Sequence, residues 1–275
     1  MTNAIEQLIK MHDPRCVSAE SMNVGRGRAS LTREQILGAF AAAQHQHSVG
    51  FDLLMTKYRN DFIAEQRLRA AINEWVHQRP HPERAVPACQ LALSIVLERN
   101  LPAQVSHLAS LFRRYGPRTA QTRKNIEALQ ADIKVLDKRR SQAQVSDIEY
   151  RELGLEITDI TLRIERERAA LRAWSERHAV TTNICPRCSG TGRTVRPHPV
   201  ECEECGGKGK IPANMEHLRK SMRMIGAVVE PGDWVSQYAD LVKQCMNWLY
   251  VEESSVSNFL SERINAERNY SEINY

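Results

Sequence analysis

Two stretches, Cys185-Pro-Arg-Cys188-Ser-Gly-Thr-Gly192 and Cys202-Glu-Glu-Cys205-Gly-Gly-Lys-Gly209, repeat one pattern, with thirteen residues between the cysteine pairs. The two-residue gap within each pair lets two thiolates reach one ion, and the pairs together can complete a tetrahedral zinc site. Glycines after each pair permit the positive φ that a chain needs where it turns back past a metal. We therefore predict two matching knuckles, in which Cys185, Cys188, Cys202 and Cys205 hold one structural Zn²⁺.

Other roles for these cysteines fit the pattern less well. A disulfide framework is typical of secreted chains, but the first seven residues, Met1-Thr-Asn-Ala-Ile-Glu-Gln7, contain no apolar signal stretch. Redox Cys-x-x-Cys motifs normally occur singly, and a catalytic zinc keeps an open position and draws on His or carboxylate ligands. The chain has seven cysteines, an odd total that fits a reducing cytoplasm.

Composition favours a helical protein without a membrane span. The 275 residues are rich in Ala, Leu, Arg, Glu and Gln and poor in aromatics. No run approaches the roughly eighteen uninterrupted apolar residues that a membrane span needs. The net charge is +5, and the segment 185–223 carries eight Lys and Arg against four Glu. Such a segment suits phosphate contact, but a solvated surface would explain the same charges.

Apolar periodicity predicts a mostly α fold: helical bundles with an inserted four-cysteine zinc knuckle and a long antiparallel coiled-coil hairpin. A capping box at Thr32 and Gln35 opens the first helix, and we expect Gly50 to end it. The predicted segments are a flexible tail (1–30), an N-terminal helical domain (31–117), a hairpin insertion (118–178), the knuckle (179–212), a C-terminal helical region (213–268) and a tail (269–275).

The hairpin prediction rests on apolar residues that recur at three- and four-residue spacing. They are Ile126, Leu129, Ile133 and Leu136 in the first helix, and Leu153, Ile157, Ile160, Ile164, Leu171 and Trp174 in the second. Charged residues fill most of the other positions, as in two long antiparallel helices. Such a hairpin could pack on itself alone, form a dimer, grip a partner or act as a stiff spacer.

After the knuckle, Asn214 is expected to cap a helix that ends near Gly226. A second helix is predicted over 234–250 and a third from Glu252. These last two helices could form a helix-turn-helix, whose second helix would present Asn258 and Arg263 to a DNA groove. Any helical hairpin gives a similar pattern.

Four stretches together resemble the Q antitermination proteins of lambda-type phages. They are Ile36-Leu-Gly-Ala-Phe-Ala-Ala-Ala-Gln44, Cys185–Arg193, Glu201–Gly209 and Gln244-Cys-x₆-Glu252-Glu-Ser254. The resemblance covers residues 30–78 and 180–265 and keeps the motifs in the order of that family. The members of that family are shorter than this chain, because they lack the 118–178 hairpin.

The resemblance implies a phage late-gene regulator in the bacterial host cytoplasm. Such proteins bind double-stranded DNA near the late promoter, engage host RNA polymerase holoenzyme and let it pass terminators. The resemblance also implies that the four cysteines are zinc ligands. It implies a protein that is not an enzyme and that has no small-molecule substrate. As phosphate contacts we predict Arg187, Arg193, Arg196, Lys208, Lys210 and Arg219, and as contacts to base edges Asn258 and Arg263.

The doubled knuckle also resembles the cysteine-rich zinc region of J-domain co-chaperones, which helps to bind unfolded clients. That family has four such repeats and a His-Pro-Asp motif, whereas this chain has two repeats and no His-Pro-Asp. Shared knuckle spacing reflects shared metal geometry rather than shared function. A zinc-knuckle client-binding protein is therefore the alternative hypothesis.

Overall fold

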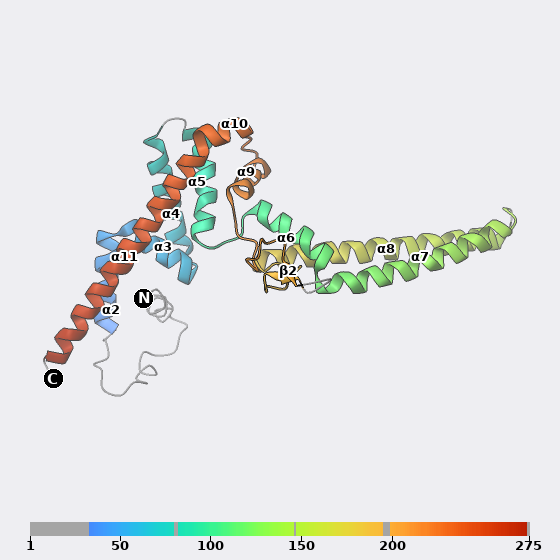
Figure 1. Ribbon diagram of the computed structural model, residues 1–275, viewed down its shortest axis with the longest axis horizontal. Coiled ribbons are helices and arrows are strands. Elements are labelled where there is room, and N and C mark those ends of the chain that lie inside the picture. Colours follow the sequence, from blue (N-terminus) through green and yellow to red (C-terminus); the bar gives the residue numbers. More distant parts are fainter. Residues whose placement is uncertain (1–32, 80–81, 146, 195–198, 274–275) are drawn as a thin grey trace. The chain divides into compact units, whose positions relative to one another are not determined.

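The structure is a computed structural model that describes residues 33–79, 82–145, 147–194 and 199–273. The predicted N-terminal tail and Thr32 of the first capping box lie outside these ranges. The fold is mostly helical, as predicted (Figure 1). It divides into two compact units, one formed by the chain up to Arg99 together with Leu218–Tyr275, the other by Asn100–His217.

The first unit is a helical bundle built from both ends of the chain. Its elements are α2 (Arg33–Gln46), α3 (Ser48–Arg59), α4 (Phe62–His77), α5 (Pro82–Val96), α10 (Pro231–Asp233), the π-helical turn η2 (Trp234–Tyr238) and α11 (Ala239–Ile273). Helix α4 begins where the Asp61 carboxylate accepts the backbone N–H groups of Ile63 and Ala64. Residues of α2, α3 and α4 form one core with Val256 and Leu260 of α11.

The C-terminal helix corrects the helix-turn-helix prediction. Residues 239–273 form the single helix α11, which leaves no turn between 250 and 252 and continues past the predicted start of the tail at 269. Its buried face runs from Val242, Cys245 and Leu249 to Val256 and Leu260. The apolar pattern is interrupted at Glu252 and Glu253, and this interruption imitated a turn. The helix-turn-helix prediction is therefore wrong.

Gly50 does not end a helix either. The break falls at His47, between α2 and α3, and Gly50 lies inside the first turn of α3. A Cβ atom at position 50 would come within 2.3 Å of the backbone oxygen of Glu252. Gly50 is thus the point where α3 crosses α11 closely, and Lys57, further along α3, reaches Glu253 at 3.0 Å.

The second unit combines helices with the knuckle segment. It contains α6 (Pro102–Tyr115), α7 (Pro117–Gln142), α8 (Ile148–Thr181), β1 (Arg193–Thr194) and β2 (Val200–Glu201), and α9 (Met215–Met224) begins in it. Asn214 caps α9 as predicted, because its Oδ1 accepts the N–H of His217 at 2.7 Å. Asp147 is the N-cap of α8.

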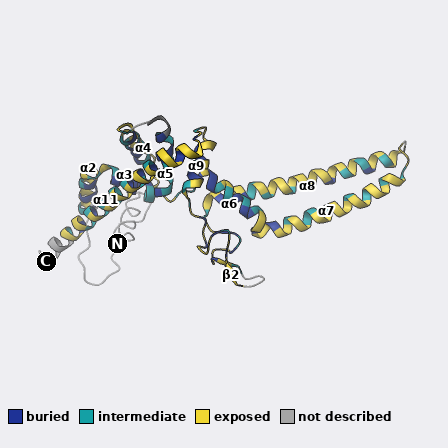
Figure 2. Cartoon of the chain, turned by 45° about the horizontal axis from the view of Figure 1, so that its top comes forward, coloured by how far each residue is buried: buried dark blue, intermediate teal, exposed yellow. Residues whose placement is uncertain are grey.

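Helices α7 and α8 form the predicted long hairpin (Figure 1). Leu153, Ile160 and Ile164 are buried along its seam, but most residues of both helices are exposed (Figure 2). Arg139 pairs with Glu149 near the tip at 2.8 Å. Among the described residues, no helix is both long and apolar enough to cross a membrane.

Candidate metal centre

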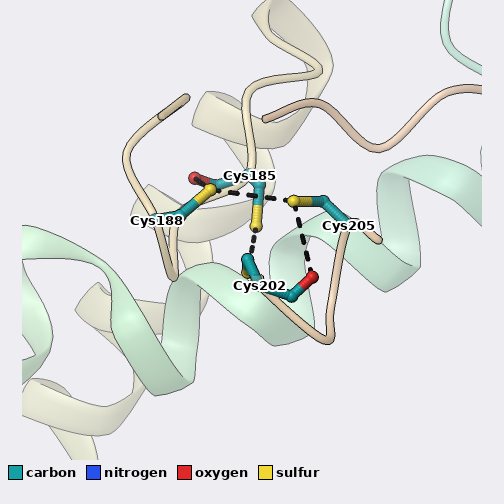
Figure 3. Close-up of side chains that lie close together, drawn as sticks. All are labelled: Cys185, Cys188, Cys202 and Cys205. Carbon is teal, nitrogen blue, oxygen red and sulfur yellow. Dashed lines mark hydrogen bonds between the residues drawn. The ribbon is translucent and has the colours of Figure 1, made fainter. Parts of the chain in front are cut away.

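The four predicted cysteines meet in one cluster (Figure 3). Their Sγ atoms all lie within 4.8 Å of one another and are buried. The Sγ atoms of Cys185 and Cys202 are 3.8 Å apart, and those of Cys188 and Cys205 are 3.7 Å apart. Four thiolates at a Zn–S distance of about 2.3 Å lie about 3.8 Å from one another in a tetrahedron. The cluster therefore has the size of a four-thiolate metal site.

The two knuckles are related by an approximate two-fold repeat of their contacts. The N–H of Cys185 donates to the Gly209 carbonyl, and the N–H of Cys202 donates to the Gly192 carbonyl, both at 2.9 Å. Gly192 and Gly209 each end a knuckle with a positive φ, of 75° and 70°. The duplication in sequence is thus also a duplication in hydrogen bonding, and each knuckle closes the other.

Short antiparallel pairings flank both knuckles. Strands β1 and β2 pair Arg193 with Glu201 and Thr194 with Val200. A single bridge joins Ile184, just before the first knuckle, to Lys210, just after the second. These pairings fix the directions in which the chain enters and leaves the cluster.

Helices α6 and α8 hold the knuckles in place. The four cysteines belong to one core with Leu108, Leu111, Phe112 and Ala179, and with Ala109 and Ile211. The Asn100 side chain donates to the carbonyls of Ala179 and Thr182, which end α8 just before the knuckle. The buried Gln104 side chain donates to the Ile211 carbonyl at 2.8 Å, just after it.

Sequence reasoning missed the supporting roles of Asn100 and Gln104. Each acts on a residue more than seventy positions away in the chain. A single sequence carries no signal for such a pairing. Gln104 also accepts the backbone N–H of Leu101 at the start of α6, and this local cap does not point to the knuckle. The interactions follow only from the packing of α6 against the end of α8.

The thiols of Cys185 and Cys188 differ in proton affinity. Burial raises the pKa of the Cys185 thiol to about 12. Burial also disfavours the Cys188 thiolate, but the backbone N–H groups of Gly192 and Gly190 outweigh it and lower its pKa to about 7. Gly209 donates its N–H to Cys205 Sγ at 3.3 Å. Since cysteine binds metals as thiolate, a metal entering this site would displace a proton from Cys185 at neutral pH.

The predicted phosphate contacts of the knuckle differ in their surroundings. Arg187 is half-buried and its Nη1 lies 2.8 Å from Glu203 Oε2 of the other knuckle. Arg193, Lys208 and Lys210 are exposed. Arg196 lies outside the described residues. Of this group, then, Arg193 and the two lysines present their charge most freely.

The remaining candidates lie in the first unit. Arg219 is half-buried on α9 and has an interaction of its own. Asn258 and Arg263 are exposed on the continuous helix α11, and Arg263 Nε lies 3.8 Å from Glu267. Asn258 and Arg263 would reach a DNA groove as part of a helix-turn-helix, which α11 does not form.

The structure thus defines a class of protein: a mostly helical chain with a buried cluster of four cysteines that is suited to bind one metal ion. A family described as conserved hypothetical protein CHP02642 matches residues 2–269. The match spans nearly the whole chain, so the protein belongs to this family. Comparisons with curated proteins and with solved structures found no match.

Proposed function

We propose that this protein is a phage transcription antitermination factor, which binds DNA near the late promoter and modifies host RNA polymerase to pass terminators. The observation that supports it most is the closed four-thiol cluster, which lies at the place in the chain where the resemblance to the Q proteins is most specific. Four thiolates around one ion leave no open coordination position for a substrate. The site thus suits a binding protein rather than an enzyme.

The ion that we propose for the cluster is a single structural Zn²⁺. Zn²⁺ has no redox chemistry and is commonly bound by four thiolates in a tetrahedron. The binding of zinc to such a site contributes directly to the free energy of folding. The sulfur separations of 3.7 and 3.8 Å match this geometry. Zinc would fix the relative positions of the two knuckles and of the basic residues that follow them.

The stretch Gln244–Ser254, which also carries the resemblance, has a clear place in the fold. Cys245 is fully buried in the first unit, and Glu253 pairs with Lys57 across the α3–α11 crossing. These residues support the helical bundle. The parts of the chain that resemble the Q proteins are therefore accounted for as one metal centre and one packed bundle.

For DNA contact we propose the exposed knuckle residues Arg193, Lys208 and Lys210. Lys208 lies within a glycine turn, and Arg193 and Lys210 directly follow one, so their charges would be presented with little loss of backbone entropy. Contacts to phosphate give affinity that does not depend on base sequence and that falls steeply with salt. Sequence selectivity would then come from another surface or from polymerase.

Run-off transcription tests the proposal directly. The template carries the late promoter of the genome that encodes the protein and a downstream terminator, and it is transcribed by purified bacterial RNA polymerase. We expect terminator read-through that requires both the protein and the promoter-proximal DNA. A template with an unrelated promoter serves as the matched control.

If the transcription test fails, the client-binding hypothesis is tested next. If zinc-loaded protein gives no read-through on the cognate template, antitermination is excluded. Suppression of the aggregation of an unfolded client, without affinity for duplex DNA, would then support the client-binding hypothesis. Loss of affinity for duplex DNA as salt rises would separate a DNA-binding protein from it.

A further inference from the structure

One face of α8 carries a stripe of charges that changes sign halfway along the helix. Its residues recur at three- and four-residue spacing, which places them on one side of the helix. In chain order the stripe consists of Glu149, Glu152, Glu156, Asp159, Arg163, Arg166, Ala170, Trp174 and Arg177. The half nearer the hairpin tip is acidic and the other half is basic.

The charges at the centre of the stripe lie along the edge of the hairpin, where Arg163 and Arg166 border a groove that α8 forms with Asn125 and Asp132 of α7. Glu156, Asp159, Arg163 and Arg166 are all exposed. Within the part of the chain that the structure describes, none of these four side chains forms an ion pair. By contrast, Glu165 and Arg168, on another face of α8, pair with each other at 2.7 Å. The stripe therefore offers free charges of both signs in a fixed order.

Large apolar side chains lie beside the acidic half of the stripe. Ile148, Leu155 and Leu162 recur every seven residues and are 74%, 72% and 51% exposed. Beside the basic half the line continues with Ala169, Ala170 and Ala173 and then with the exposed Val180, and Trp174 lies on the stripe itself. The three largest exposed apolar residues of the hairpin part of α8 thus accompany its negative charges.

We propose that α8 is a dimer interface that takes a second copy of this chain in antiparallel orientation. A two-fold axis near Thr161 places Asp159 opposite Arg163 of the second copy. The same axis places Glu156 opposite Arg166 of the second copy. Because the interface is isologous, each pairing occurs twice.

The apolar residues take neighbouring positions around the same axis. Leu162 lies next to its own counterpart at the centre, so that each copy covers an exposed leucine of the other. Leu155 lies opposite Glu167 of the second copy and beside Ala170, and Ile148 lies opposite Trp174 and beside Ala173. The order of the charges, rather than side-chain volume, therefore selects the register.

The stripe fits a second copy better than it fits a nucleic acid. A phosphate backbone that followed the basic half would be repelled by the adjacent acidic half. It would also leave Leu155 and Leu162 in water. Neither objection applies to an antiparallel copy, which meets each half with the opposite half.

Charge-swap variants of the full chain test the proposal by light scattering coupled to size-exclusion chromatography and by sedimentation velocity. Wild type should show a mass of twice the 31.3 kDa chain mass and should dissociate as salt is raised. E156R and R166E each place like charges opposite each other twice. Each should raise the dimer dissociation constant at least about tenfold. The double variant E156R/R166E restores opposite charges and should return the constant to within about threefold of wild type.

R172E is the matched control, because Arg172 is also exposed on α8 but lies away from the stripe. It makes the same charge change as R166E and should leave the dimer intact. Circular dichroism establishes that each variant keeps its helices. A monomeric wild type at about 100 µM would overturn the proposal, since a stable interface associates well below that concentration. Equal dissociation by R172E, or no restoration in the folded double variant, would overturn it as well.

Discussion

Gly192 lies so close to Gly207 that a Cβ atom on Gly192 would come within 2.1 Å of the Gly207 carbonyl oxygen. The contact repeats with the knuckles exchanged, because a Cβ on Gly209 would come within 2.2 Å of the Gly190 carbonyl oxygen. The two knuckles can therefore close around one ion only if these positions lack side chains. This explains the glycine pattern as a requirement of packing between knuckles as well as of positive φ.

Gly192→Ser should consequently weaken zinc binding. The φ of 75° and the contact with Gly207 both oppose a side chain. A cost of about 2 kcal/mol is expected for such overpacking. It would appear as a roughly thirtyfold loss of zinc affinity, because metal binding and knuckle folding are coupled. Competition with a chromophoric chelator measures this loss.

Gly206→Ser is the matched control for that variant. A Cβ at position 206 meets nothing within 4 Å. Ser189 occupies the equivalent position of the first knuckle with a φ of 50°, and Gly206 has a φ of 51°. Affinity near that of wild type is expected, and an equal loss in both variants would contradict the packing argument.

Cys188→Ser should abolish stable metal binding. The substitution removes one of four thiolates and leaves the other three without a closed site. Elemental analysis after dialysis against a chelator should find one zinc per chain in wild type and none in the variant. Cys89→Ser, which changes a buried cysteine of the first unit, should keep its zinc.

The helical signal of Cys188→Ser should fall little, because α7 and α8 pack on each other beyond the knuckle. Terminator read-through should be lost together with the metal. A metal-free variant that still supports read-through would show that the cluster has no structural part in the activity.

The metal site and the hairpin were predictable because both follow from local spacing. Two residues between cysteines fix the distance between two thiols, and a three- and four-residue apolar period fixes one helix face. The sequence also predicted the cap at Asn214 for the same reason. Each of these features depends on residues that are near one another in the chain.

The errors arose where a distant residue determines local structure. Gly50 was expected to end a helix, but its lack of a side chain serves the crossing with Glu252. Glu252 and Glu253 interrupt an apolar pattern, but Glu253 meets Lys57 there instead of marking a turn. Helix propensity alone cannot distinguish the end of a helix from a close crossing of two helices. Both appear in the sequence as a glycine or as polar residues that interrupt an apolar pattern.

Gly50→Ala should destabilise the first unit. Its Cβ would meet the Glu252 backbone oxygen at 2.3 Å and Val256 Cγ1 at 2.9 Å, so α3 and α11 must move apart. We expect a loss of about 1–3 kcal/mol in the free energy of unfolding. Gly38→Ala is the control, because nothing lies within 4 Å of its Cβ and alanine favours the helix by about 1 kcal/mol. Urea unfolding should show opposite shifts, and two shifts of the same sign would refute the close crossing.

Arg193→Ala should weaken DNA binding by a similar factor on every sequence. Arg193 is the exposed first residue of β1, and a phosphate contact there carries no base information. The slope of log affinity against log salt should fall in magnitude by about 0.9 for one lost contact. Arg151→Ala, at an exposed position of the hairpin, is the control and should change neither quantity. A loss confined to one DNA sequence would instead make Arg193 a base-reading residue.

Glu65→Gln should show a stability loss that depends on pH. The Glu65 carboxylate accepts hydrogen bonds from Arg69 at 2.7 Å and from Arg99 at 2.8 Å. Burial alone would raise the pKa of Glu65, but the hydrogen bonds from Arg99 and Arg69 outweigh it and hold the pKa below its usual range. A carboxyl whose pKa is lower in the folded state stabilises the fold above its unfolded pKa of about 4.3, and this contribution disappears as the pH falls through the folded pKa. The variant should therefore lose about 2 kcal/mol at pH 7, and the difference should shrink below pH of about 4. Urea unfolding across this pH range measures both.

Glu262→Gln is the control for this variant, because Glu262 is exposed and has no ion pair within the described chain. It should be as stable as wild type at every pH. If the loss of stability in Glu65→Gln stayed constant down to the lowest pH, the two arginines would not act through the charge of Glu65.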